Sequence, residues 1–148
     1  MPAPVVAEGN RISNGVYAVS AEKGAAGVQI LLRGKPVFVA FQAEGREWVN
    51  MFSPAAVAKF DYVFTDSMTW TDNRGRRMRT WIPAEVGQIA DPQEFMETLV
   101  SRAVGILENE PVDIYVNPTF IPDQIAARYD ELWTDERIGK VVRAAISR

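Results

Sequence analysis

Short, continuous apolar runs alternate with segments of helical periodicity over most of the chain. The first run follows Pro36 and is typical of a strand that is covered on both faces. Three such runs predict β-strands, at residues 37–41, 60–64 and 112–116. The first 33 residues have a weaker pattern, from which we predict a short strand at residues 16–19 and a turn at residues 23–27.

Two helix starts are marked by capping residues. Ser53 followed by Pro54 predicts a short helix that ends at about Lys59. Asp91 begins a longer helix, because its carboxylate can accept free backbone N–H groups and Glu94 can complete a capping box. This helix is predicted to end at about Glu108, and its apolar stripe consists of Phe95, Met96, Leu99, Val100, Ala103, Val104 and Leu107.

Two more helices are predicted after the strand at residues 112–116. One extends from Pro122 to about Leu132, and Thr134 caps the last one. The predicted buried stripe of the last helix consists of Ile138, Val141, Val142, Ala145 and Ile146. Strands that alternate with helices imply parallel strands joined by right-handed crossovers, so we predict an α/β fold. A length of 148 residues is usual for one domain, and we expect a single α/β domain over 1–148.

An oxygen-bearing side chain follows each of the three predicted strands: Glu44, Asp66 and Asn117. Active sites of such folds lie at the carboxyl ends of the strands, so we expect these side chains on one face. Glu44 and Asp66 are candidate Mg²⁺ or Mn²⁺ ligands, since these ions accept carboxylate oxygens without histidine. The alternatives are that a carboxylate here is solvated or paired with Arg46, and that Asn117 orders the turn after it.

The polar segment at residues 65–87 is predicted to be a long loop. Its basic residues could clamp a phosphate or carboxylate, or could form a solvated surface; they are Arg74, Arg76, Arg77 and Arg79. Trp48, Trp70 and Trp81 could wall a ligand pocket or could close the top of a core. We therefore predict a small anionic molecule as the partner.

Composition excludes several classes of function. The chain contains no cysteine and no histidine, so zinc sites of the usual kind and Ser-His or Cys-His catalysis are excluded within it. A net charge of -3 and the lack of a basic stripe argue against nucleic acid. No apolar run approaches the ~20 residues of a membrane span, and we expect a cytoplasmic protein with no membrane partner.

Four segments resemble a known group of proteins. The segments PVFVAFQAEGREW, FDYVFTDSMTWTDNRGRRMRTWIP, PVDIYVNPTF and YDELWTDERI look like the central part of a divergent group of metal-dependent hydrolases. The group is related to the PHP (polymerase and histidinol phosphatase) and amidohydrolase-type barrels. The resemblance covers residues 34–148, and residues 1–33 diverge. It implies a partial or shortened TIM-barrel-like architecture, because a complete barrel needs ~250 residues.

The resemblance assigns roles to the strand-end residues and also shows departures. Glu44 matches a strand-end metal ligand, whereas a His ligand would fall near Asp66 and another on Asn117. The opening His-x-His strand and the closing Asp-containing strand of the family have no counterparts here. Enzymatic activity therefore stays open at this point.

Two hypotheses follow. In the first, Glu44 and Asp66 hold a divalent ion that activates water, while Arg76, Arg77 or Arg79 neutralises an anionic substrate and Trp70 and Asn117 contribute to its binding. In the second, the chain is a non-catalytic ligand-binding or assembly module, which pairs with another copy to form a homo-oligomer.

Overall fold

A computed structural model describes residues 6–8, 11–13, 18–24, 27–32, 35–71 and 76–147. The chain forms two compact units, Met1–Val39 and Ala40–Arg148. In the described ranges, no helix is both long enough and apolar enough to cross a membrane.

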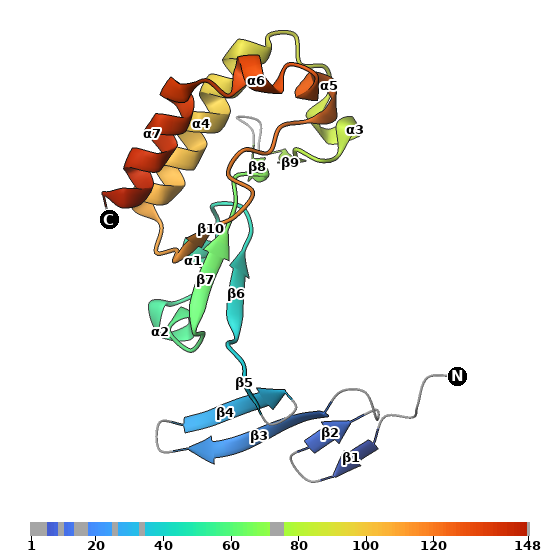
Figure 1. The fold of residues 1–148 in the computed structure, drawn as a ribbon, viewed down its shortest axis with the longest axis vertical. Coiled ribbons are helices and arrows are strands. Elements are labelled where there is room, and N and C mark those ends of the chain that lie inside the picture. Colours follow the sequence, from blue (N-terminus) through green and yellow to red (C-terminus); the bar gives the residue numbers. More distant parts are fainter. Residues whose placement is uncertain are drawn as a thin grey trace. The chain divides into compact units, whose positions relative to one another are not determined.

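The first unit is an antiparallel sheet whose five strands follow one another in chain order (Figure 1). The strands are β1 (Val6–Glu8), β2 (Arg11–Ser13), β3 (Ala18–Gly24), β4 (Gly27–Leu32) and β5 (Lys35–Pro36). Gly24 lies opposite Gly27, which makes β3 and β4 a hairpin at the predicted turn. The strand predicted at residues 16–19 coincides with β3 from Ala18, while Val16 and Tyr17 lie outside the described residues. The regular elements in the described part of this unit are all strands, and each strand pairs with the next one along the chain.

The second unit contains a parallel sheet of order β10-β7-β6. Its strands are β6 (Ala40–Ala43), β7 (Tyr62–Thr65) and β10 (Ile114–Tyr115). The central strand β7 pairs in parallel with both neighbours, and helices occur in each connection. The prediction of parallel strands alternating with helices is therefore confirmed for this unit. The described strands form open sheets and do not close into a barrel.

The first predicted strand begins later than expected. Residues 37–39 have no regular structure, and Phe38 is 79% exposed, so the apolar run after Pro36 is not covered on both faces. The physical reason lies in the pairing on either side of this segment. Pro36 pairs with Leu31 in the first unit, whereas Ala40 pairs with Tyr62 in the second.

The capping residues set the helix starts as predicted. Ser53 accepts a hydrogen bond from the Ala56 N–H and begins α2 (Pro54–Val57), which is shorter than expected. Asp91 accepts hydrogen bonds from the backbone N–H groups of Gln93 and Glu94 and begins α4 (Pro92–Asn109). Two short helices were not predicted, α1 (Trp48–Met51) and α3 (Pro83–Val86).

The main core lies between α4 and the C-terminal helices. The helix predicted from Pro122 to Leu132 is instead two short helices, α5 (Asp123–Ala126) and α6 (Tyr129–Leu132). Thr134 caps α7 (Asp135–Ile146), and α7 lies beside α4 (Figure 1). The buried residues of this core are Trp70, Met96, Leu99, Val100, Ala103, Leu107, Ile121, Ile125, Leu132, Trp133, Val141 and Ala144.

The predicted stripe of α7 is largely wrong. Ile138, Val142 and Ile146 are 39%, 50% and 75% exposed, whereas Arg137, Val141 and Ala144 are buried. The face of α7 that carries Arg137 is the buried one, because the Arg137 guanidinium donates hydrogen bonds to two residues of α4. The acceptors are Glu97 Oε1 and Gln93 Oε1, each at 2.8 Å. The helix is therefore turned so that this face meets α4.

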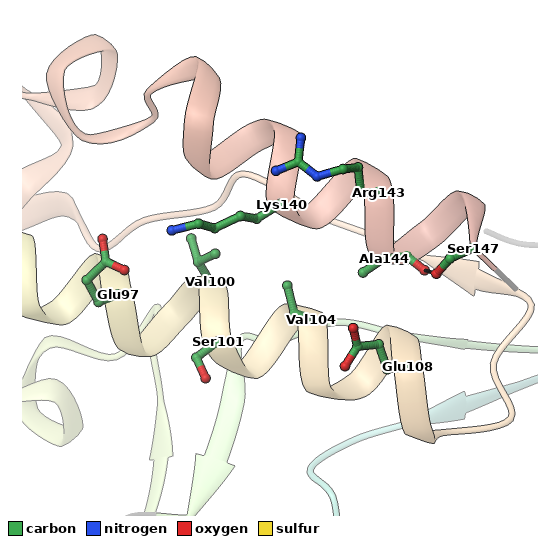
Figure 2. Close-up of a pocket in the computed structure, with 9 residues that line it drawn as sticks. All are labelled: Glu97, Val100, Ser101, Val104, Glu108, Lys140, Arg143, Ala144 and Ser147. Atoms are coloured by element: carbon green, nitrogen blue, oxygen red, sulfur yellow. Dashed lines mark hydrogen bonds between the residues drawn. The ribbon is translucent and has the colours of Figure 1, made fainter.

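Charged side chains line a groove along the α4 and α7 pair. Glu97 and Glu108 come from α4, and Lys140 and Arg143 come from α7, as Figure 2 shows. The groove has a volume of about 490 Å³. It contains none of the strand-end residues of the parallel sheet.

A buried carboxylate joins the end of α4 to α1. Glu110 is 3% exposed and accepts hydrogen bonds from Trp48 Nε1 at 2.7 Å and from Arg46 Nε at 2.9 Å. Trp48 in turn packs with Ala43 and Val63 in a second, smaller core. Arg46 is thus the partner of Glu110 and not of Glu44.

Leu132→Ala should destabilise the second unit by about 2–5 kcal/mol, because Leu132 is 0% exposed and its removal leaves a cavity. The matched control is Ile146→Ala, at a 75% exposed position, which should change the free energy of unfolding by no more than about 0.5 kcal/mol. Urea denaturation followed by tryptophan fluorescence measures both. Equal effects would contradict this description of the core.

Glu110→Ala should cost about 1–3 kcal/mol, because it leaves the buried Trp48 N–H without an acceptor. Glu110→Gln keeps an acceptor oxygen and should cost less than Glu110→Ala. The same denaturation experiment orders the two variants. A larger loss in Glu110→Gln than in Glu110→Ala would show that the hydrogen bond from Trp48 is unimportant.

Candidate functional site

The parallel pairing brings the three strand ends to one edge of the sheet. Thr65 lies opposite Ala43 on one side and opposite Tyr115 on the other. Its buried hydroxyl donates to the Ala43 carbonyl at 2.5 Å, and its own carbonyl accepts from the Val116 N–H at 2.8 Å. Glu44, Asp66 and Asn117 each follow these aligned positions within one or two residues. They therefore leave the sheet at the same edge.

Asp66 is the half-buried member of this group. Its Oδ1 accepts a hydrogen bond from the Met68 N–H at 2.8 Å. Burial raises the pKa of Asp66, and the charge of Glu44 raises it further, against the lowering effect of hydrogen bonds from Met68 and the Asn117 side chain. Asp66 therefore interacts with both Glu44 and Asn117 at this edge of the sheet.

Asn117 has a left-handed backbone conformation, with φ of 50°. Asparagine tolerates this conformation better than most residues. The turn after it is closed by the backbone, because the Phe120 N–H donates to the Asn117 carbonyl. Asn117 also lowers the pKa of Asp66, so the turn and the acidic residue are electrostatically linked.

Glu44 is exposed and paired with a basic residue of the next segment. Arg77 Nη2 donates to Glu44 Oε2 at 2.8 Å. Both residues line a pocket of about 440 Å³, together with Glu47 and Thr71. Gly45 lies two residues after the end of β6 and has φ of 70°, a backbone conformation that L side chains rarely adopt. The chain therefore needs glycine directly after Glu44.

The segment at residues 65–87 is not a simple loop. It forms a hairpin of β8 (Thr69–Thr71) and β9 (Arg77–Arg79), followed by α3. The prediction of a loop was wrong. The segment has too few apolar residues to show the pattern of a strand in the sequence, yet it pairs as a hairpin. Arg74 lies outside the described residues, and Arg76 is exposed.

Arg79 is held by a carboxylate that the sequence did not single out. Arg79 Nε donates to Glu85 Oε1 and Oε2, each at 3.0 Å, and Nη2 also donates to Oε1. The hydrogen bonds from Arg79 lower the pKa of Glu85 to about 2. Arg77 and Arg79 are thus both engaged with carboxylates, and an anion would have to compete for either of them.

The tryptophans have mainly packing roles. Trp48 and Trp70 are each 3% exposed and belong to the two cores, whereas Trp81 is 44% exposed. Trp70 also has Arg102 stacked on it, with Cζ 4.4 Å from the ring centroid. Arg102 is a residue of α4 that the sequence reading passed over.

Tyr115 is another residue near the candidate site that the sequence did not single out. It lies in β10 beside Asp66, and burial raises its pKa to about 12. Only its place one residue inside a predicted strand end could have drawn attention to it. The sheet edge thus carries a neutral phenol in addition to the carboxylates.

The oxygen ligands at this edge of the sheet are of the type that a hard cation prefers, but there are few of them. In the part of the chain that the structure describes, no group of three or more His, Cys, Asp or Glu side chains could hold a metal ion. Glu44 and Asp66 supply carboxylates, and Asn117 supplies an amide oxygen. Mg²⁺ is often bound by only one or two carboxylates and keeps several waters, so these residues fit such an ion without forming a closed cage.

Searches of known proteins gave no relative: no family model, no curated protein and no solved structure matches the chain.

Asp66→Asn should become increasingly stable relative to wild type as the pH rises above the ordinary pKa of an aspartate. The folded protein raises the pKa of Asp66, so the folded state binds this proton more tightly than the unfolded state does, and wild type loses stability as the pH rises. Asn cannot ionise, and its side-chain oxygen can still accept from Met68. Thermal denaturation of both proteins at several pH values measures the difference, and a difference that does not change with pH would contradict the burial of the Asp66 charge.

Proposed function

We propose that the sheet edge formed by Glu44, Asp66 and Asn117 is the site of a metal-dependent, hydrolase-like protein that acts on a small anionic substrate. The observation that carries the proposal is the convergence of two carboxylates and an amide at the carboxyl ends of three parallel strands. The resemblance of residues 34–148 to PHP-like and amidohydrolase-type proteins points to the same chemistry. A cytoplasmic location is part of this proposal.

In this proposal Glu44 and Asp66 hold Mg²⁺ or Mn²⁺. When bound, such an ion lowers the pKa of water and polarises a phosphoryl or carbonyl oxygen. Asn117 orients the Asp66 carboxylate through its side-chain hydrogen bond. Arg77, released from Glu44, becomes a partner for the anionic group of the substrate. Arg79 lies on the same strand, β9, and Arg76 directly precedes that strand.

The second candidate is a non-catalytic ligand-binding or assembly module. It is supported by the ion pair of Glu44 with Arg77, since a cation would have to displace Arg77 from this carboxylate. The lack of histidine in the sequence also supports it. Such a module would pair with a second copy, and light scattering of the full chain measures this.

Titration of Mn²⁺ into the metal-free protein, followed by electron paramagnetic resonance and calorimetry, tests the first proposal. Wild type should bind one equivalent, and Glu44→Gln and Asp66→Asn should each weaken binding at least about tenfold, because each removes one charged ligand. Glu131→Gln is the matched control. Glu131 is also exposed and paired with an arginine, Arg128, but lies on α6 away from the strand ends.

Binding of Mn²⁺ that is equally strong in all four proteins would refute the assignment of Glu44 and Asp66. If the ion binds at this site, hydrolysis of p-nitrophenyl phosphate with Mn²⁺ present separates the two candidates. Turnover that is lost in Glu44→Gln supports the enzyme. Stoichiometric binding without turnover supports the non-catalytic module.

A further inference from the structure

A third cavity lies between the β8–β9 hairpin and α4. It has a volume of about 360 Å³, within the range of small-molecule pockets. Its apolar walls include Trp70, Phe95 and Met78, and the Trp70 and Phe95 rings are 5.7 Å apart between centroids. Such walls suit a flat, apolar molecule.

Arg102 is the basic residue that lines this cavity. In the described part of the chain it forms no ion pair, and its single hydrogen bond is a long one, from Nη2 to the Thr71 carbonyl at 3.5 Å. Its Nε is buried and has no hydrogen-bond partner. A guanidinium carries five N–H donors, so most donors of Arg102 have no partner among the described residues.

Arg137 shows how this fold treats an arginine whose role is structural. Arg137 also packs against α4, and it donates to Glu97 Oε1, Gln93 Oε1 and the Leu132 carbonyl at 2.7–2.8 Å. Arg102 has no comparable set. Burying a charge is costly unless it is paired, and burial accordingly lowers the pKa of Arg102, with the charge of Arg46 adding to the effect. An anion beside Arg102 would remove this penalty.

Two acids also line the cavity but are distant along α4. Asp91 is occupied as the N-cap of the helix. Glu94 precedes Arg102 by eight residues, which is about 12 Å along the helix axis. A single anionic group at Arg102 therefore keeps clear of both carboxylates.

We propose that this cavity binds a small aromatic carboxylate, whose anionic group pairs with Arg102 while its ring packs against Trp70 and Phe95. The site is separate from Glu44 and Asp66, and binding needs no divalent ion. This separation makes its failure distinguishable from that of the proposed function, because the test is carried out with a chelator present.

The probe is naphthalene-2-carboxylate, titrated into the full chain by calorimetry in a buffer that contains EDTA and no phosphate. Wild type should bind it at least about tenfold more tightly than the neutral naphthalene-2-carboxamide, because only the acid can form a charge-assisted pair. Arg102→Gln should remove this preference, because it lowers the affinity for the carboxylate and leaves the affinity for the carboxamide unchanged. Arg102→Lys, which keeps the charge and loses the planar fork, should fall between the two.

Arg143→Gln is the matched control, since Arg143 lines the other groove, on α7, and its loss should not change the affinity for the acid. Circular dichroism checks that each variant is folded. If Arg102→Gln is not folded, the comparison of acid with amide in wild type and in Arg102→Lys decides. Equal affinity of wild type for acid and amide, no loss in a folded Arg102→Gln, or no binding of the acid at roughly 1 mM would overturn the proposal.

Discussion

Parallel pairing of β7 with both β6 and β10 is the constraint on which the candidate site depends. Because β7 is central, the ends of all three strands are fixed at one edge, and the residues that follow them leave the sheet there. The buried Thr65 hydroxyl ties this edge to the Ala43 carbonyl, so the two strands end in step. Without this alignment Glu44 and Asn117, which are 73 residues apart in sequence (117 − 44), would have no reason to lie near Asp66.

Two buried charged side chains connect the helices of the second unit to the rest of that unit. Glu110 at the end of α4 connects to Trp48 and Arg46, so the chain just after Glu44 is anchored to the helix. Arg137 connects α7 to α4 in a similar way. Both are buried charges with several hydrogen bonds, which is the usual condition for burying a charge. Arg102 departs from this condition, and it does so at a cavity.

The arginines of the second unit divide by their partners. Arg77 and Arg79 follow the basic pattern that draws attention in the sequence, yet each already has a carboxylate, Glu44 or Glu85. Arg102 stands alone in an amphipathic helix and has no such partner among the described residues. Sequence spacing can show where positive charges gather, but pairing with acids that are distant in sequence determines which of them retain unused donors.

The sequence by itself determined the parallel α/β character of the second unit, the caps at Ser53, Asp91 and Thr134, and the three strand-end residues. These follow from local rules, since capping and apolar runs involve residues near one another in the chain. Tertiary structure alone decided the antiparallel sheet of the first unit, the hairpin within residues 65–87, the buried face of α7 and the partner of each arginine. These depend on contacts between distant segments, and short polar strands or a buried Arg137 leave no periodic signal from which to predict them.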